Sequence, residues 1–289
     1  MSYLKTFVRN MAYLAKHSLW QQREDDIVYL TEKILSDGIV EYGLNLPGYE
    51  QECILEKFES IKKITQSNKS FVRLCDGEVA IMKGISQPFQ KAEPEIQSVL
   101  LDLLKGKYPD ILVGLNKNYY TPGYILKSKY DRRNDFDFRS FFNKYSDKKM
   151  TYIDGACTFY FPQDERSKQH ESFWNLWLEA FKGKDIVIIC GEGILDKLEY
   201  DVFKLASSKE FIFGPKKHAW DCHKELVDKI HKVSKDKMLV FILGMAGKAM
   251  IPELTKEGYL CWDIGHLAKS YDVYMRNVPF DPIKFYAPD

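Results

Sequence analysis

The second half of the chain alternates short apolar runs, rich in β-branched residues, with longer amphipathic stretches. The runs predict strands and the stretches predict helices, in strictly alternating order, at residues 185–190, 194–207, 210–213, 219–233, 238–243, 246–257 and 259–263. This order and spacing are typical of crossover units that place neighbouring strands parallel. The continuous apolar runs IVIIC and MLVFIL predict strands buried on both faces, as parallel sheets require. We therefore expect an α/β fold with a Rossmann-like, mostly parallel sheet flanked by helices.

The first half of the chain adds less regular elements. Residues 70–75 and 111–115 predict two further strands, and residues 93–104 predict a helix between them. No stretch rich in Pro, Gly and Ser marks a linker. We therefore expect one continuous domain over residues 68–289, preceded by a helical N-terminal extension over residues 1–67.

The first 23 residues contain four Lys and Arg residues and no acidic residue, and their apolar side chains follow the spacing of one helical face. One interpretation is a basic amphipathic helix that lies on an anionic membrane surface. The alternative is a helix that packs against the domain's own core or forms a dimer contact. Both interpretations stay open at this point.

Composition excludes several classes of protein. The chain carries 42 Lys and Arg residues against 41 Asp and Glu residues, a net charge of +1, so we expect no nucleic-acid partner. The longest apolar run, residues 238–247, is half the roughly 20 residues that a membrane span needs. The six cysteines form no C-x-x-C pair and no signal peptide is apparent, which favours a reduced, cytoplasmic protein.

Ligands of open α/β sheets bind in loops at the carboxyl ends of strands, and the first such loop here is Asp76-Gly77-Glu78. A glycine turn between two carboxylates can aim both at one hard divalent cation. Arg73, three residues earlier, is suited to bind a phosphate or to brace a carboxylate. The alternative is a surface turn followed by an acidic residue in the first turn of a helix.

Two further loops are rich in glycine. The loop that contains Gly191 and Glu192 matches a dinucleotide-binding fingerprint incompletely, and Glu192 is a candidate base or an acid at a helix N-terminus. The loop from Gly244 to Lys248 has two residues between its glycines, where a Walker A loop has four. It suits a phosphate or a sugar, or alternatively allows close packing of a helix on the sheet.

The last loop, Asp263-Ile-Gly-His266, ends the final predicted strand. Its Asp and His are a candidate acid and base pair, and the alternative is that the histidine only makes structural hydrogen bonds. Two other patterns are weaker. Asp135-Phe-Asp137 has the D-x-D spacing of metal-dependent sugar transfer but follows no apolar strand, and the histidines near Cys222 lack further zinc ligands.

Together these loops resemble the GT-D-type glycosyltransferases. Residues 70–84 (SFVRLCDGEVAIMKG) are similar to the strand–RFGDGE–helix signature of that family. DIVIICGEG resembles its apolar strand and Glu-Gly-Glu turn, and FIFGPKKHAWDCHKELVDKI resembles its strand, proline and Asn-Ala-aromatic helix. Residues 243–272 resemble its Gly-Pro-Thr loop, helix and Asp-Ile-Gly-His close.

The resemblance implies a metal-dependent hexosyltransferase that moves a sugar from a nucleotide-sugar donor, usually UDP-linked, to a glycan, glycolipid or glycoprotein acceptor. The expected setting is bacterial surface-polysaccharide or glycoprotein biosynthesis. It implies that Asp76 and Glu78 hold Mn²⁺ or Mg²⁺ against the donor diphosphate. The residues assigned to donor binding are Arg73, Asp76, Glu78, Gly191, Gly214, Pro215, Gly244, Gly247 and Lys248. The catalytic candidates are Glu192, Asp263 and His266, with Glu192 and His266 as alternative general bases.

The chain departs from the family pattern at three places. Leu74 and Cys75 replace the phenylalanine and first glycine of the signature, residues 194–201 replace an Arg-Leu-Gly-x-x-Asn-Asp segment, and Gly244-Met-Ala246 replaces Gly-Pro-Thr. Two other functions remain as alternatives. One is an S-adenosylmethionine-dependent methyltransferase with IVIICGEG as its cofactor loop, and the other is a non-catalytic nucleotide-binding scaffold of a polysaccharide complex.

Overall fold

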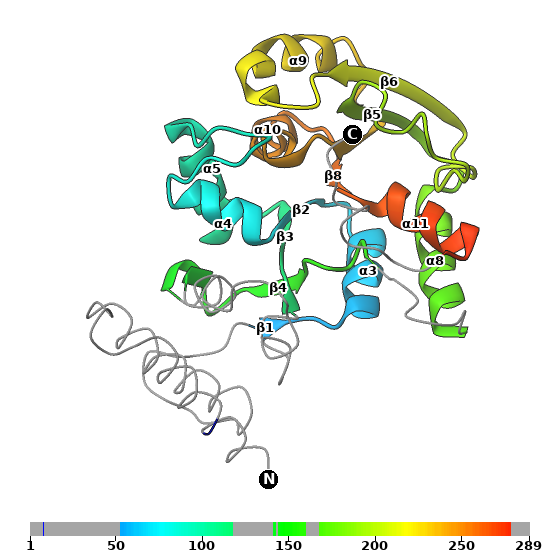
Figure 1. Cartoon of the computed structure of the whole chain (residues 1–289), viewed down its shortest axis with the longest axis horizontal. Helices are drawn as coiled ribbons and strands as arrows, with labels where there is room; N and C mark the ends of the chain where they lie inside the picture. Colours follow the sequence, from blue (N-terminus) through cyan, green and yellow to red (C-terminus); the bar gives the residue numbers. More distant parts are fainter. Residues whose placement is uncertain (1–7, 9–52, 118–140, 143, 160–167, 279–289) are drawn as a thin grey trace.

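The computed structural model describes residue 8 and residues 53–117, 141–142, 144–159 and 168–278. These residues form an eight-stranded sheet with the strand order β1-β4-β3-β2-β8-β7-β5-β6 (Figure 1). The strands are β1 (Cys53–Ile54), β2 (Ser70–Leu74), β3 (Ile111–Leu115), β4 (Thr151–Asp154), β5 (Asp185–Gly191), β6 (Ser208–Gly214), β7 (Met238–Ile242) and β8 (Cys261–Asp263). The basic N-terminal segment and the Asp135–Asp137 pattern lie outside the described residues.

Every strand pairing in the described sheet is parallel, which confirms the predicted Rossmann-like architecture. The inner strands are buried along their length because helices cover both faces, and this explains the continuous apolar runs of β3, β5 and β7; β2 also carries the buried polar residues Ser70 and Arg73. Side chains alternate between the faces. In β5, for example, Val187 and Ile189 face one core while Ile186 and Ile188 face the other.

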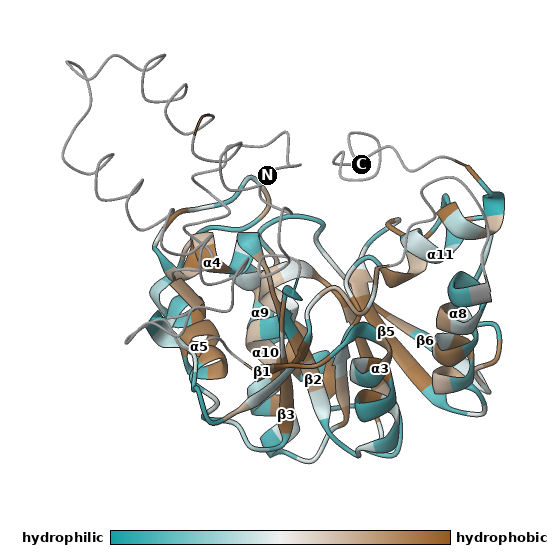
Figure 2. Ribbon diagram, turned by 90° about the horizontal axis from the view of Figure 1, so that it is seen from below, coloured by the Kyte–Doolittle hydropathy of each residue, from teal (hydrophilic) through white to brown (hydrophobic). Residues whose placement is uncertain are grey.

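The helices form one layer on each face of the sheet (Figures 1 and 2). Four helices pack in the first core, namely α4 (Asp76–Met82), α5 (Pro94–Leu104), α9 (His223–Ile230) and α10 (Gly244–Lys256). Three helices pack in the second core, namely α3 (Lys57–Gln66), α8 (Lys168–Phe181) and α11 (Leu267–Arg276). A short 3₁₀ helix, η3 (Ala219–Cys222), precedes α9. None of the helices in the described part of the chain has the length and apolar character needed to cross a membrane.

The helix predicted over residues 194–207 is wrong. The segment is a series of turns, in which backbone hydrogen bonds join residues three apart, as from the Leu198 N–H to the Leu195 carbonyl (3.1 Å). The buried carboxylate of Asp272 on α11 accepts hydrogen bonds from the backbone N–H groups of Glu199 (2.8 Å) and Tyr200 (3.1 Å). These side-chain bonds occupy donors that a helix would use, so the segment stays irregular despite its apolar spacing.

The other predicted elements are present with shifted ends. The helix predicted over residues 219–233 is divided into η3 and α9, and Gly258 follows α10 with a positive φ of 98°. The sequence did not predict β1 or β4, which pair with each other. Within the predicted N-terminal extension, residues 53–66 contribute β1 and α3, so this part of the extension belongs to the sheet and its second core.

Strands β2 and β8 meet at the centre of the sheet, where the chain's two halves join. Strands β1 to β4 lie on one side of this junction and β5 to β8 lie on the other. In doubly wound sheets such a junction leaves a crevice outside the carboxyl ends of the strands. Asp76 follows β2 and His266 follows β8, so the two loops that carry most of the predicted site lie side by side.

Candidate active site

A buried ion pair joins the two halves of the sheet at this crevice. The Arg73 guanidinium donates from Nε to Asp263 Oδ2 (3.2 Å) and from Nη2 to Asp263 Oδ1 (3.2 Å). Its Nη1 donates to Thr158 Oγ1 (2.7 Å), beyond the end of β4. Burial alone would lower the pKa of Arg73, but the Asp263 carboxylate outweighs burial and raises it. Both Asp263 oxygens therefore hold Arg73, which suits positioning of the site better than proton transfer by Asp263.

The second buried ion pair joins Lys248 on α10 to Glu78 on α4. The Lys248 ammonium donates to Glu78 Oε1 and lies 3.8 Å from Asp263 Oδ2. Glu78 Oε2 accepts a hydrogen bond from the Cys75 backbone N–H (2.8 Å), which caps the start of α4. Burial opposes the charge of Lys248, but Asp263 and Glu78 together raise its pKa. Lys248 is thus a buried cation between two carboxylates.

Asp76 differs from Glu78, two residues away, because its side chain is exposed at the carboxyl edge of the sheet. The surrounding protein raises the pKa of Asp76, and the nearby Glu78 carboxylate raises it further. Among the described residues, Asp76 forms no ion pair. A second cation at this point would relieve the repulsion between the two carboxylates.

The residues fit a divalent cation that takes some of its ligands from the protein and the others from a bound substrate. Asp76 offers an open carboxylate, and Glu78 retains lone pairs beyond its bonds to Lys248 and Cys75. Magnesium-like sites typically use one or two carboxylates together with substrate phosphates. Within the described residues there is no group of three or more His, Cys, Asp and Glu side chains suited to hold a metal alone.

His266 occupies the N-cap position of α11, beside the Arg73–Asp263 pair, and its side chain makes no capping hydrogen bond. The packed protein around the imidazole lowers the pKa of His266 to about 4, and the positive charges of Arg73, Lys269 and Lys248 contribute to the shift. The side chain still has an exposed face, and its ring lies 5.7 Å from the Phe159 ring. His266 is therefore neutral at pH 7, and its imidazole is a weaker base than that of an unperturbed histidine.

The glycine loop after β5 lies farther from Asp76, because β8 and β7 separate β2 from β5. The exposed Glu192 side chain follows Gly191, and the Glu192 N–H bonds to the Gly214 carbonyl (3.1 Å). A Cβ at Gly191 would lie 3.1 Å from Lys216 Cα, so this glycine allows two loops to touch. The exposed Pro215 follows Gly214 at the end of β6.

The glycines of the loop after β7 have separate roles. Gly247 is buried in α10, and a Cβ there would lie 3.2 Å from Phe241 Cδ1 and 3.3 Å from Leu243 Cβ. This geometry supports the packing interpretation for Gly247. Gly244 is exposed, has a φ of 57°, and has open space where a Cβ would be. Gly244 therefore remains the better candidate for contact with a ligand.

Sequence reasoning missed the contribution of β4. Its last residue, Asp154, is buried, which raises the pKa of the carboxyl, and it accepts the Ala156 N–H (2.9 Å). Thr158 follows and holds Arg73. A signal was present, because the apolar run before Asp154-Gly155 resembles the strand before Asp76-Gly77.

Of the two histidines near Cys222, His223 has structural partners, whereas the buried His218 Nδ1 forms no hydrogen bond with a described residue. The His223 ring stacks on Trp220 at 3.9 Å, and His223 Nδ1 lies 2.6 Å from the Trp220 carbonyl oxygen. His218 adopts a left-handed conformation with a φ of 53° at the start of η3.

Comparison with known proteins agrees with this architecture. Residues 71–284 match the family described as "Glycosyltransferase GT-D fold". The chain is 24% identical over 235 residues to "Glycosyltransferase GlyD" of Streptococcus pneumoniae serotype 4. This alignment covers 78% of this chain and 28% of that protein. It is 22% identical over 251 residues to "Probable glycosyl transferase Gly" of Streptococcus gordonii, covering 83% and 36%. The chain thus spans about a third of the length of these relatives.

A solved structure has the same fold. It is described as "The highly conserved domain of unknown function 1792 has a distinct glycosyltransferase fold" and is superposable with a TM-score of 0.71 at 23% identity. The match covers 86% of this chain and 87% of that one. The family match includes both the Asp76 loop and the His266 loop. The chain belongs to the GT-D glycosyltransferase family.

Proposed function

We propose that this protein is a metal-dependent glycosyltransferase that takes its sugar from a UDP-linked donor. The observation that carries the proposal is the open Asp76 carboxylate at the junction of the two half-sheets, beside a buried network of Arg73, Asp263, Lys248 and Glu78. Family membership favours sugar transfer over the methyltransferase alternative. A methyltransferase would also leave this network of charged side chains without a role.

Donor binding would place the diphosphate against the open carboxylate. Asp76 would hold Mn²⁺ or Mg²⁺ as its main protein ligand, with Glu78 contributing its remaining lone pairs. When bound, the cation supplies Lewis-acid stabilisation of the charge that develops on the leaving diphosphate. Lys248 fixes Glu78, and Arg73 fixes Asp263, so the positions of the carboxylates are set before substrate arrives.

The acceptor hydroxyl must lose a proton as it attacks the sugar. We favour His266 over Glu192 as the group that accepts it, because β8 is adjacent to β2 whereas β5 is three strand positions away. At a spacing of about 4.8 Å between neighbouring strands, β5, which precedes Glu192, lies about 14 Å from β2, which precedes Asp76. His266 is neutral above about pH 4, so its imidazole is unprotonated at neutral pH, as a general base must be.

The proposed acceptor is a glycan, glycolipid or glycoprotein of a bacterial surface-polysaccharide or glycoprotein pathway. The names of the two streptococcal relatives support sugar transfer, although each relative is much longer than this chain. Peripheral attachment through residues 1–23 remains a prediction, since that segment lies outside the described residues.

The proposal is tested by incubating the purified chain with UDP-glucose, UDP-galactose, UDP-N-acetylglucosamine and GDP-mannose, each with Mn²⁺ or with EDTA. We expect release of UDP from at least one UDP-sugar with Mn²⁺, and loss of that release with EDTA. Release that EDTA does not change would contradict metal dependence. Release from GDP-mannose alone would contradict the UDP donor.

A further inference from the structure

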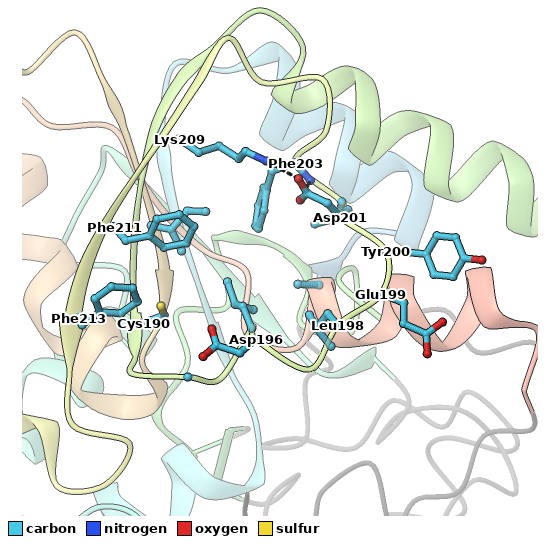
Figure 3. A pocket seen from close by; sticks show the side chains of 15 residues that line it. Cys190, Asp196, Leu198, Glu199, Tyr200, Asp201, Phe203, Lys209, Phe211 and Phe213 are labelled. Carbon is cyan, nitrogen blue, oxygen red and sulfur yellow. Dashed lines mark hydrogen bonds and ion pairs between the residues drawn. The ribbon is translucent and has the colours of Figure 1, made fainter.

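A pocket lies at the far edge of the sheet, between β6 and the irregular segment that replaces the predicted helix (Figure 3). Its volume is about 320 Å³, at the lower end of the range for small-molecule sites. Ile188 and Cys190 of β5 form the floor, and Val202 and Ala268 contribute from the covering side. The irregular segment over residues 194–207 contributes much of the remaining lining, from Leu195 to Phe203.

Two phenylalanines on β6 form one wall of the pocket. Phe211 and Phe213 lie on the same face of the strand, with ring centroids 5.6 Å apart and ring planes inclined by only 10°. The two rings stack on each other with an offset, and their side chains are 45% and 48% exposed, so solvent reaches the ring surface that the stacking leaves uncovered. Figure 3 shows both rings on one side of the pocket, with Phe203 across from them. Aromatic rings of this size are normally buried or used for binding.

The charges at the pocket select against anionic ligands. Asp201 is paired with Lys209 at one end, and Glu199 lies 3.7 Å from Arg276. Asp196, at the end near Phe213, forms no ion pair with any described residue and is exposed. A phosphate or a lipid headgroup would meet the Asp196 carboxylate, although the Lys216 ammonium lies near it on the other side of Gly193, whereas hydroxyl groups would find in Asp196 a strong hydrogen-bond acceptor.

We propose that this pocket binds a neutral sugar ring, stacked on Phe211 and Phe213, with Asp196 as acceptor for its hydroxyl groups. The weakly positive C–H groups on one face of a pyranose match the negative face of an aromatic ring. The hydroxyl groups around its rim need acceptors such as Asp196. A flat apolar wall beside an acidic acceptor therefore fits a saccharide better than an acyl chain, which would leave the carboxylate unused.

The position of the pocket indicates which unit of a glycan chain it would bind. Strand β6 is four positions from β2 in the sheet, so the pocket lies about 19 Å from the donor site. The first turn of α11 connects the two places, because His266 precedes it and Ala268 lines the pocket. If the proposed function holds, the pocket binds a remote sugar unit of an extended glycan acceptor, and the reacting hydroxyl lies several units away.

The test is saturation-transfer NMR on the full chain with cellobiose, maltose and N,N′-diacetylchitobiose as probes. We expect saturation of at least one disaccharide in the unsubstituted protein. The double substitution Phe211→Ala and Phe213→Ala should weaken its binding at least about tenfold. Phe89→Ala is the matched control, since Phe89 is 43% exposed and lies outside the pocket lining, and it should leave binding unchanged.

A second variant separates stacking from general apolar contact. Phe211→Leu with Phe213→Leu keeps most of the apolar area but removes the flat rings, so a stacked sugar should again be lost. Binding that survives in the leucine variant, or in the alanine variant, would overturn the proposal, as would the absence of binding by all three probes. Binding of UDP with Mn²⁺ is measured on the same samples. Its failure while disaccharide binding behaves as expected would contradict the proposed donor but not the sugar pocket.

Discussion

At Gly265 the absence of a side chain leaves room for the Arg73 guanidinium. A Cβ at this position would overlap Arg73 Nη2 and lie 2.7 Å from its Cζ, and the backbone has a φ of 49°. Gly265→Ala should therefore displace Arg73 from Asp263 and leave a buried charge without its partner. We expect the free energy of unfolding in urea to fall by about 3 kcal/mol or more.

Gly183→Ala is the control for this substitution. Gly183 has a similar φ of 68° but nothing within 4 Å of its Cβ position, so it measures backbone strain alone. That strain should cost about 1 kcal/mol. Equal losses for the two variants would show that Arg73 adjusts freely and that its ion pair with Asp263 is not a rigid part of the site.

Lys248 and Glu78 allow a double-mutant cycle on the second buried pair. Lys248→Met leaves the Glu78 carboxylate buried without its cation and should destabilise the fold by about 3 kcal/mol. Adding Glu78→Gln removes the stranded charge while its carbonyl still accepts the Cys75 N–H, so the double variant should be more stable than Lys248→Met. Urea unfolding of the unsubstituted protein, the two single variants and the double variant measures these differences in stability. A double variant that loses the sum of both single effects would contradict direct pairing.

The assignment of the general base to His266 or to Glu192 leads to different expected pH dependences of sugar transfer. If His266 accepts the acceptor's proton, kcat should be level near neutrality and fall in acid with an apparent pKa of about 4, because protonation removes its lone pair. His266→Ala should lower kcat by about 10²–10⁴-fold with donor binding retained. Glu192→Gln should change kcat by only a few-fold. The opposite pattern would assign the base to Glu192.

At the scale of elements, the buried Asp272 determines the form of the segment between β5 and β6. Asp272→Ala should remove the partners of the Glu199 and Tyr200 N–H groups and cost about 1–3 kcal/mol. Hydrogen exchange should accelerate over residues 194–207. Asp228→Ala, on the exposed face of α9, is the control and should leave exchange there unchanged. Unchanged exchange in Asp272→Ala would mean that packing, not this carboxylate, holds the segment.

The same segment shows what sequence patterns can and cannot predict about elements. Strands β3, β5 and β7 are apolar runs, and β2 is mostly apolar, so local sequence alone identifies them. The apolar residues of 194–207 also have helical spacing, but a carboxylate about 70 residues later determines their conformation. Strand β1 has two residues and depends entirely on its pairing with β4. Such long-range interactions leave no local pattern.

At the scale of the whole molecule, the site forms where the two half-sheets meet. The loops after β2, β7 and β8 were each predictable, because each follows an apolar strand with charged residues and glycine. The contacts between the side chains of these loops were not predictable from the sequence. Arg73 bonds to a residue 190 positions away and Lys248 to one 170 positions away, so only the folded sheet shows that these side chains hold each other. This pairing leaves Asp76 as the open carboxylate.

The most direct test of the account is calorimetric titration of UDP, with and without Mn²⁺, into the unsubstituted protein and the Asp76→Asn variant. We expect UDP to bind tightly only with Mn²⁺, and Asp76→Asn to lose this metal-dependent binding while it unfolds at an unchanged temperature. Asp135→Asn with Asp137→Asn, the other acidic pattern, should bind as the unsubstituted protein does. Full metal-dependent binding in Asp76→Asn, with loss in the Asp135 and Asp137 variant, would contradict the placement of the metal at this crevice.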